Sequence, residues 1–383
     1  MSLIPEIIQK EFQKLFSSSP LLVRSPGRVN FIGEHTDYNQ GFVLPAAVDK
    51  SIYLGVGKNR SSLCRIHSLD MRDSLEIPLN ELQKSRKSWA NYLLGMTDQL
   101  QQAGYEFSGF DCVFSGDIPI GAGMSSSAAM ETGLGYALNY LFDLGIRSLD
   151  LVRMAQKAEN EFVGVQCGIM DQFVNVFGVK NKALKIDCRS LEYSYHSFSF
   201  PDTEIILYDT GVSHALASTE YNRRRSECEQ GVRCLQKFDS RIHSLRDVTP
   251  ELLKSRKNDM DPVVFRRCRY VVQENLRLQS ACLDLEKKNL SQFGEKMYQT
   301  HFGLRDDYQV SCAELDFLVR FTEDDPRILG SRMMGGGFGG CTINLFQGNS
   351  TEFNNKIKHF YGKKFNRGLK VYKIRIENGT QIM

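Results

Sequence analysis

Four polar side chains that could bind a neutral polyol lie close together near the N-terminus. Arg28, Glu34, His35 and Asp37 fall within ten positions of the chain. Carboxylate, imidazole and guanidinium groups suit such a ligand, because a carboxylate or a guanidinium can hydrogen-bond two hydroxyls at once. We therefore predict that this segment binds a sugar or another polyol, although the residues alone also suit a polar surface turn.

A turn rich in glycine and serine leads into a helical pattern at residues 119–131. It lacks the lysine of a P-loop, and Ser126 stands where a dinucleotide-binding turn has its third glycine. Gly121 and Gly123 nevertheless let backbone amides approach a ligand, and the helix that follows presents unpaired N–H groups at its N-terminus. With hydroxyls at residues 125–127, the segment predicts a phosphate-binding loop; a structural turn is the alternative.

Glu159 lies where an apolar side chain is expected. In the helix predicted over residues 148–163, Val152, Ala155 and Phe162 share its face, so the carboxylate falls within the buried stripe. A buried carboxylate needs a positive partner, which can be Mg²⁺ or an arginine. Glu159 is thus either a metal ligand or one half of a structural ion pair.

Asp171 lies early in a short helix predicted over residues 169–178, among apolar neighbours. The helix dipole, or a nearby arginine, would favour the ionised form of its carboxyl group. In that form it could accept or steer a proton from a bound hydroxyl. The alternative is an acid that only stabilises the helix N-terminus.

Five glycines occur in the six positions 335–340. Glycine loses more conformational freedom on folding than any other residue, so this density indicates that something approaches the backbone closely. The approaching group could be a ligand, or the run could be a tight packing turn.

The elements that must hold these residues mix helices and strands. The spacing of apolar residues predicts an amphipathic helix over 3–16 and another helix over 88–103. Apolar and β-branched runs separated by turn residues predict strands at 21–24, 42–48, 51–57, 63–67 and 109–115, and a hairpin near 183–200.

A return to a β-pattern at residues 203–209 opens a second region. Charged helices are predicted over 218–320, and a strand over 341–346 follows the glycine run. We therefore expect an α+β protein of two domains, residues 1–200 and 201–383.

The bulk properties narrow the class of protein. A chain of 383 residues with 42% apolar and 24% charged residues is typical of a soluble globular protein of two domains. A formal net charge of +3 gives no reason to expect nucleic acid or an anionic membrane as a partner. Ten scattered cysteines without a Cys-x-x-Cys pair, and acids where a signal peptide would be apolar, predict a cytoplasmic protein with reduced thiols.

Taken together, the motifs resemble those of the GHMP family of small-molecule kinases. Residues 26–45 are similar to the sugar signature of its galactose-phosphorylating branch, 119–131 to its phosphate-binding motif and 335–341 to its third, glycine-rich motif. The similarity extends through residues 167–173 and 218–221. The family implies an N-terminal α/β domain with the phosphate-binding loop, a ferredoxin-like C-terminal domain, and an active site in the cleft between them.

The resemblance also implies a reaction: transfer of the γ-phosphoryl group of ATP to the anomeric hydroxyl of galactose, with Mg²⁺ as cofactor. Asp171 is similar to the family's general base, and Arg28 to the residue that stabilises charge at the reaction centre. The positions similar to sugar contacts are Glu34, His35, Thr36, Asp37, Gly168 and Tyr221. Those similar to ATP contacts are Ser68, Gly121, Ala122, Gly123, Met124, Ser125, Ser126 and Ser127, and those similar to Mg²⁺ ligands are Ser127 and Glu159. We expect a monomer.

Two departures from the family pattern lie outside the positions assigned to chemistry. Met334 stands where a small or hydroxyl residue is more usual, and residues 374–380 lack the usual glycine-alanine finish. Two other functions remain open: a kinase of the same fold for N-acetylgalactosamine or another sugar, and a non-catalytic sensor of galactose and ATP. A damaged serine loop would mark the sensor, whereas Ser127 and Ala128 are present here.

Overall fold

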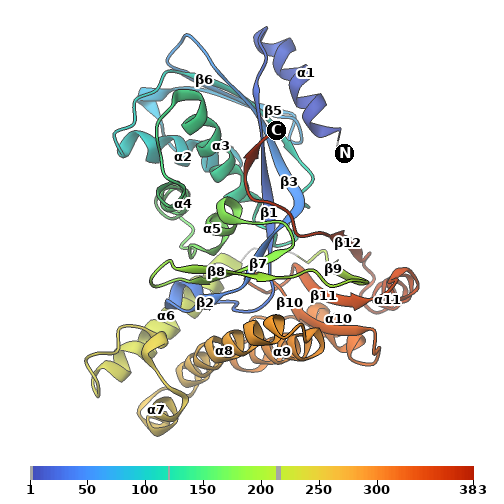
Figure 1. The fold of residues 1–383 in the computed structure, drawn as a ribbon. Coiled ribbons are helices and arrows are strands. Elements are labelled where there is room, and N and C mark those ends of the chain that lie inside the picture. The colour runs from blue at the N-terminus through green and yellow to red at the C-terminus, as the bar shows by residue number, and fades with distance from the viewer. Residues whose placement is uncertain (1–2, 120, 213–216) are drawn as a thin grey trace.

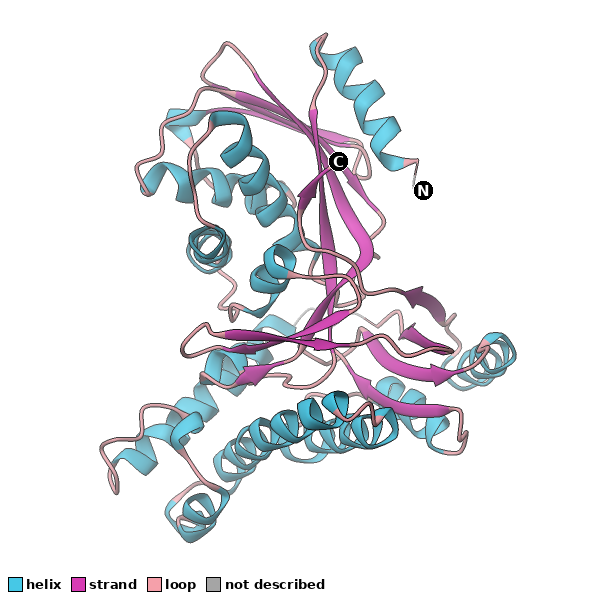
Figure 2. Cartoon of the chain, in the orientation of Figure 1, coloured by secondary structure: helices cyan, strands magenta, loops and turns pink. Residues whose placement is uncertain are grey.

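The structure is a computed structural model that describes residues 3–119, 121–212 and 217–383. Figures 1 and 2 show two layered regions, each built from a sheet with helices packed against it. Among the described residues, no helix is long and apolar enough to cross a membrane.

The first sheet has six strands in the order β13–β1–β3–β6–β4–β5. Its two longest strands, β1 and β3, pair antiparallel, and their register shifts between Pro26 and Arg28. A shift of this kind re-aims the side chains beside it, which matters because Arg28 is a candidate site residue. The strands are β1 (Leu21–Asn30), β3 (Pro45–Lys58), β4 (Leu63–Ser68), β5 (Asp73–Pro78), β6 (Phe110–Gly116) and β13 (Gln381–Ile382).

Helices cover both faces of this sheet. The predicted N-terminal helix is confirmed: α1 packs on β3 and β6 and buries Ile8 and Phe12, which lie one turn apart. The other helices gather on the opposite face, where α3 packs on β1 and β3 (Figure 1). Their bounds are α1 (Ile4–Phe16), α2 (Ala90–Gln102), α3 (Ser126–Phe142), α4 (Ser148–Lys157) and α5 (Met170–Phe177).

Four predicted elements of the first half are wrong in detail. The strand predicted at 21–24 continues to Asn30, and those predicted at 42–48 and 51–57 form the short β2 and the single long β3. Polar residues at 49–51 hide this continuity in the sequence. They lie at the irregularity in the pairing with β1, which is regular again from Ser51 onward and from Ala47 backward. The helix predicted over 148–163 changes at Ala158 into the π-helical turn η3 (Ala158–Val163).

A small sheet of three strands, in the order β2–β7–β8, connects the two regions. It contains the predicted hairpin, whose strands pair antiparallel, and β2 adds to the edge of β7. The strands are β2 (Phe42–Val43), β7 (Lys182–Asp187) and β8 (Tyr193–Ser197).

The second region has a four-stranded antiparallel sheet in the order β10–β11–β9–β12. The predicted strands at 203–209 and 341–346 are β9 and β11, neighbours at its centre. The combination of this sheet with long charged helices confirms the predicted α+β class. The strands are β9 (Thr203–Asp209), β10 (Ile328–Met333), β11 (Cys341–Gln347) and β12 (Lys370–Ile374). The helices are α6 (Ala217–Gln236), α7 (Pro250–Ser255), α8 (Pro262–Glu286), α9 (Leu290–Phe302), α10 (Ala313–Glu323) and α11 (Thr351–Phe365).

The end of the chain returns to the first sheet. Strand β13 pairs with β1, Ile376 forms a bridge with Val48, and Arg24 donates to the carbonyl of Asn378 at 2.6 Å. The last eight residues or so therefore pack on the first half rather than on the second. The division at residue 200 stays a prediction, and it coincides with the connection from β8 to β9.

Candidate active site

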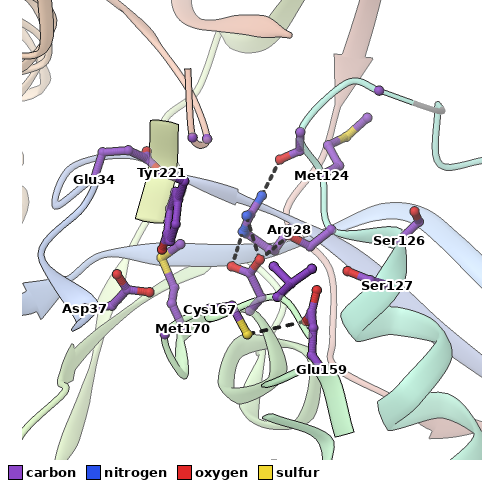
Figure 3. Close-up of a pocket in the computed structure, with 18 of the residues that line it drawn as sticks. Arg28, Glu34, Asp37, Met124, Ser126, Ser127, Glu159, Cys167, Met170 and Tyr221 are labelled. Atoms are coloured by element: carbon purple, nitrogen blue, oxygen red, sulfur yellow. Dashed lines mark hydrogen bonds and ion pairs between the residues drawn. The ribbon is translucent and has the colours of Figure 1, made fainter. Parts of the chain in front are cut away.

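A cavity of about 540 Å³ lies between the two halves of the chain. The first half contributes the polar loop (residues 31–41) and the serine loop (residues 119–127), and the second contributes Tyr221 and the start of the glycine run. The predicted site residues that line it are Arg28, Glu34, His35, Asp37, Gly121, Gly123, Met124, Ser125, Ser126, Ser127, Glu159, Gly168, Asp171 and Tyr221. Figure 3 shows Glu34, Asp37 and Tyr221 on one side of Arg28, and Ser126, Ser127 and Glu159 on the other.

Arg28 and Asp171 form a bidentate ion pair between these two sides. Arg28 Nε donates to Asp171 Oδ1 at 2.6 Å, and Nη2 donates to Oδ2 at 2.8 Å. Nη1 donates to the carbonyl of Gly123, and the hydroxyl of Ser125 donates to Asp171. Burial alone would lower the pKa of Arg28, but the carboxylate of Asp171 raises it above its ordinary value. The pair thus fixes β1, the serine loop and α5 to one another through charge-assisted hydrogen bonds.

The serine loop has the backbone geometry that its glycines predict. Gly121 and Gly123 have φ of +80° and +71°, a region that a side chain would disfavour. The loop is held against β1, because the Arg28 N–H donates to the Met124 carbonyl at 3.1 Å. Helix α3 begins at Ser126, within the last residues of the loop, so the unpaired N–H groups of its first turn lie at the cavity. Ile120, within the loop, lies outside the described residues.

Glu159 is buried without an arginine. Gln172 Nε2 donates to its Oε2 at 2.7 Å, and Ser127 and Cys167 also hydrogen-bond to this carboxylate. Burial raises the pKa of Glu159 to about 7, and the charge of Asp171 adds to the effect. Among the described residues no lysine or arginine pairs with it, so the structural ion pair left open by the sequence is wrong. The carboxylate lies in the π-helical turn η3, a distortion frequent at functional sites.

This environment fits a hard divalent cation. A buried carboxylate with a raised pKa gains its missing positive partner when a metal binds, and the hydroxyl of Ser127 lies within hydrogen-bonding reach of it. Within the described residues, no three His, Cys, Asp or Glu side chains are grouped to hold a metal by themselves. Such a site needs ligands from a substrate, as is common for Mg²⁺ bound with phosphate.

Glu34 is fixed from the second half of the chain. Arg332 of β10 is fully buried and donates through Nη2 both to the Glu34 carboxylate and to the carbonyl of Asn30, the latter at 2.6 Å. The side chain of Asn30 donates to the same carboxylate at 3.2 Å. Arg332 therefore links the two halves of the chain. Removing it would leave the Glu34 carboxylate buried without its positive partner.

Asp37 lies against Gly168 in the wall of the cavity. The pKa of Asp37 is raised to about 7, mainly by burial. The negative charges of Asp171 and Glu34 also raise it, and together they outweigh the lowering by Arg28. A Cβ atom at residue 168 would lie 1.8 Å from Asp37 Oδ2. Only glycine therefore fits at this position while Asp37 keeps its place.

His35 and Tyr221 complete the polar loop's side of the cavity. Their ring centroids lie 5.3 Å apart, so α6 of the second half meets the loop directly. His35 has φ of +61°, a conformation that is uncommon for a residue with a side chain and that marks local strain. Burial lowers the pKa of His35 to about 3, and the charges of Arg224 and Arg332 lower it as well. The imidazole is therefore neutral near pH 7.

Three residues named from the sequence do not line the cavity. Thr36 is fully buried and its hydroxyl donates to the carbonyls of Gly33 and Phe42, so it closes the polar loop. Ala122 is buried beneath the serine loop, and the Ser68 hydroxyl accepts from Met71 N–H at the end of β4. The structure thus gives Thr36 a role in shaping the site and brings neither Ala122 nor Ser68 to its surface.

Other lining residues have no signal in the sequence. Tyr92 comes from the first turn of α2, and Gly164, Val165 and Asn222 come from connections and a helix face without a motif. The glycine run serves both purposes considered for it. Its first members, Gly335 and Gly336, line the cavity, whereas a Cβ atom at residues 337 or 339 would collide with backbone carbonyls.

The comparisons with known proteins agree with this geometry. Three family models match: the galactokinase galactose-binding signature over residues 10–58, the GHMP kinases N terminal domain over 91–179, and the GHMP kinases C terminal over 282–363. A galactokinase of Roseiflexus sp. is 39% identical over 97% of this chain and 96% of its own length. A galactokinase of Clostridium acetobutylicum is 41% identical over 93% of both chains.

Solved structures agree on the fold. The crystal structure of the Lactococcus lactis galactokinase complexed with galactose superposes with a TM-score of 0.95 at 33% identity and covers 99% of both chains. The mevalonate kinase of Methanococcus jannaschii superposes with a TM-score of 0.65 at 17% identity, covering 94% of this chain and 99% of its own, and shares the fold.

Proposed function

The chain belongs to the galactokinase family of GHMP kinases, and from this premise we propose how its residues carry out the reaction. It is an ATP-dependent kinase that phosphorylates galactose. The observation that carries the mechanism is the Arg28–Asp171 pair, which lies between a loop suited to phosphate and a loop suited to a sugar. Both substrates can therefore reach the same two side chains.

The nucleotide side of the site is the serine loop with the N-terminus of α3. Backbone N–H groups at Gly121, Gly123 and the first turn of the helix hold the phosphates of ATP. Those of the first turn have no partner within the helix and lie at its positive end, and the two glycines lie in the loop just before it. The hydroxyls of residues 125–127 add further donors. The glycines keep the backbone free of side chains at the point where a phosphate must come close.

Ser127 and Glu159 would hold Mg²⁺, with the remaining ligands coming from the phosphates. The bound cation would neutralise charge on the phosphate oxygens. Gln172 and Cys167 orient the Glu159 carboxylate by hydrogen bonds at 2.7 and 3.5 Å. This arrangement explains why a carboxylate occupies the apolar stripe of its helix.

The sugar side consists of Glu34, His35, Asp37, Gly168 and Tyr221. They bind the hydroxyls of galactose so that its anomeric hydroxyl faces Asp171. Asp171 accepts the proton of the anomeric hydroxyl as the sugar oxygen attacks the γ-phosphate. Arg28 stabilises the negative charge that develops. Catalysis then depends mainly on positioning and on charge neutralisation, as in other phosphoryl transfers.

The two other functions left open by the sequence are less well supported. A sensor without activity needs no intact reaction centre, yet the serine loop, Arg28, Glu159 and Asp171 all line one cavity. A preference for an acetylated sugar would need room beside the polar loop, where Gly168 and Asp37 leave no space between them. We also propose a cytosolic location, because all ten cysteines are free thiols and six of them are buried.

The test is direct. The purified protein is incubated with galactose, ATP and Mg²⁺, and the product is identified by ³¹P NMR while ADP release is followed in a coupled assay. We expect galactose 1-phosphate and ADP in equal amounts. If galactose and ATP both bind but no sugar phosphate forms, the protein is a sensor and the mechanism above is wrong.

A further inference from the structure

A chain of buried and half-buried polar groups runs from α6 to the polar loop. Cys228 Sγ lies 3.2 Å from the Tyr308 hydroxyl, which lies 2.8 Å from the Tyr38 hydroxyl. The Tyr38 hydroxyl lies 2.7 Å from His35 Nδ1. We call these four side chains the His35 chain; its members in the second half of the molecule, Tyr308 and Cys228, do not line the cavity.

The His35 chain is held in one geometry by packing. The rings of His35 and Tyr308 lie 4.9 Å apart, and Tyr308 also packs on Tyr270 at 4.8 Å. Arg224 Nε donates to the Tyr308 carbonyl at 2.7 Å. Because Tyr308, Cys228 and Arg224 are all buried, the hydroxyl of Tyr308 has few other positions to occupy.

The opposite side of the His35 ring makes no hydrogen bond of normal geometry, although the backbone of Gly336, which lines the same cavity, interacts with the ring and opposes the lowering of its pKa. The Nε2 atom of the ring is buried and lacks a partner, although the ring lines the cavity beside Glu34 and Asp37. In a neutral imidazole one nitrogen carries the proton, and the hydrogen bond made by the other nitrogen decides which one. Whatever bonds to Nδ1 therefore decides whether Nε2 is a donor or an acceptor toward a bound sugar.

The chemistry of the chain favours one direction. A phenol is a good donor and a poor acceptor, the unprotonated imidazole nitrogen is a good neutral acceptor, and thiol sulfur is a weak acceptor. The strongest set of bonds is therefore obtained when Cys228 donates to Tyr308, Tyr308 to Tyr38, and Tyr38 to His35 Nδ1. In the reverse direction the Tyr308 hydroxyl would donate its proton to Cys228 Sγ, which is a weak acceptor.

We propose that Tyr38, Tyr308 and Cys228 are positioning residues that keep His35 with its proton on Nε2, and so make it a fixed donor to a galactose hydroxyl. The proposal rests on the proposed function and deepens it. Carboxylate oxygens only accept hydrogen bonds, so an N–H on His35, which lines the cavity with Glu34 and Asp37, supplies the donor that a carboxylate lacks. A hydroxyl can then donate to a carboxylate and accept from His35, which fixes its direction as well as its position.

The proton on His35 can be located in the parent protein. We propose ¹⁵N NMR of the protein labelled at histidine, with the His35 signals assigned by comparison with His35→Gln. The expected result near pH 7 is an Nδ1 resonance in the range of an unprotonated ring nitrogen and an Nε2 resonance in the range of a protonated one. The opposite pattern in the parent protein would overturn the proposal.

Substitutions then test whether the chain sets this state. Tyr38→Phe should move the Nδ1 and Nε2 resonances toward a mixture of both forms, and Tyr308→Phe should move them in the same direction but less. The matched control is Tyr270→Phe, because that hydroxyl is equally buried but donates to the Glu34 carbonyl at 2.9 Å and lies outside the His35 chain. It should leave the His35 resonances in place.

Kinetics provide the second measurement. Tyr38→Phe should raise KM for galactose about tenfold, the factor that corresponds to one neutral hydrogen bond, and should raise it more than it lowers kcat or changes KM for ATP. Unchanged His35 resonances and unchanged KM for galactose in Tyr38→Phe would refute the proposal. So would a shift in Tyr270→Phe as large as that in Tyr38→Phe. A parent protein that does not phosphorylate galactose contradicts the proposed function instead, whatever the position of the proton.

Discussion

Asp37→Asn should remove the pH dependence of galactose binding near neutrality. Burial, Asp171 and Glu34 raise the pKa of Asp37 to about 7, so the carboxylate that we propose as an acceptor for the sugar loses its charge below that pH. Galactose affinity of the parent protein should therefore weaken by up to about tenfold per pH unit below pH 7 and level off above it. The asparagine variant should bind more weakly at pH 8 but with no such slope, because an amide does not titrate in this range.

The negative charge on the buried Asp37 carboxylate also reduces the stability of the folded protein. In the unfolded chain the Asp37 carboxyl ionises at its ordinary pKa of 3.8, so between about pH 4 and pH 7 the folded state binds the extra proton. The free energy of unfolding of the parent should fall, relative to that of Asp37→Asn, as the pH rises through this window, and the difference should then stay constant. A shift of about three units corresponds to about 4 kcal/mol as an upper limit, and partial exposure to the cavity reduces it to about 2–4 kcal/mol.

Both effects are measured without ATP or metal, so that the phosphates take no part. Glu159, whose pKa is also raised to about 7, is common to parent and variant, so its titration cancels in the comparison. Isothermal titration calorimetry gives galactose affinity from pH 6 to pH 8, and urea unfolding of both proteins gives the difference in stability from pH 4.5 to pH 8. An equal slope of affinity with pH in parent and variant would refute the assignment of this titration to Asp37. If Asp37→Asn is less stable than the parent at pH 8, the claim that the buried, ionised Asp37 destabilises the folded protein is wrong.

Three other substitutions test the remaining groups. Asp171→Asn should lower kcat by roughly 10²–10⁴, the usual size of general-base catalysis, and a near-normal rate would show that Asp171 only holds Arg28. Glu159→Gln should weaken the apparent affinity for Mg²⁺ far more than that for galactose, and superimposed Mg²⁺ titrations of variant and parent would show that Glu159 binds no metal. Gly168→Ala should raise KM for galactose and leave KM for ATP within about twofold, because the added Cβ would lie 1.8 Å from Asp37 Oδ2; equal effects on both constants would contradict this placement.

Much of the site could be predicted because its residues come in short, dense motifs. The polar loop, the serine loop and the glycine run each combine several unusual choices within about ten positions, and the structure brings all three to one cavity. The resemblance to a family then supplied roles that spacing alone left open. Glu159 illustrates the difference: the helical pattern placed it in a buried stripe, but only the structure shows that no arginine reaches it.

The residues that sequence analysis missed act across the fold. Arg332 lies in a strand and pairs with Glu34 about three hundred positions earlier, and nothing near either residue in the sequence indicates the other. Tyr308 approaches Tyr38 in the same way, through a buried contact between the two halves. Thr36 is the opposite case: the motif suggests a sugar contact, but the structure does not bring this side chain to the cavity. Its hydroxyl instead donates to backbone carbonyls and closes the polar loop.

The central claim is that this cavity selects galactose as the acceptor of the phosphoryl group. Galactose and glucose differ only in the direction of one hydroxyl, so discrimination must come from directional hydrogen bonds to Glu34, His35, Asp37 and Tyr221. Each buried polar group left unpaired by the wrong epimer costs about 1–3 kcal/mol, so one or two predict a preference of roughly 10²–10⁴. The decisive measurement is kcat/KM for galactose, glucose and N-acetylgalactosamine at saturating ATP and Mg²⁺. We expect galactose to exceed glucose by that factor and the acetylated sugar to be a poor substrate; equal use of galactose and glucose, or a preference for N-acetylgalactosamine, would contradict the account.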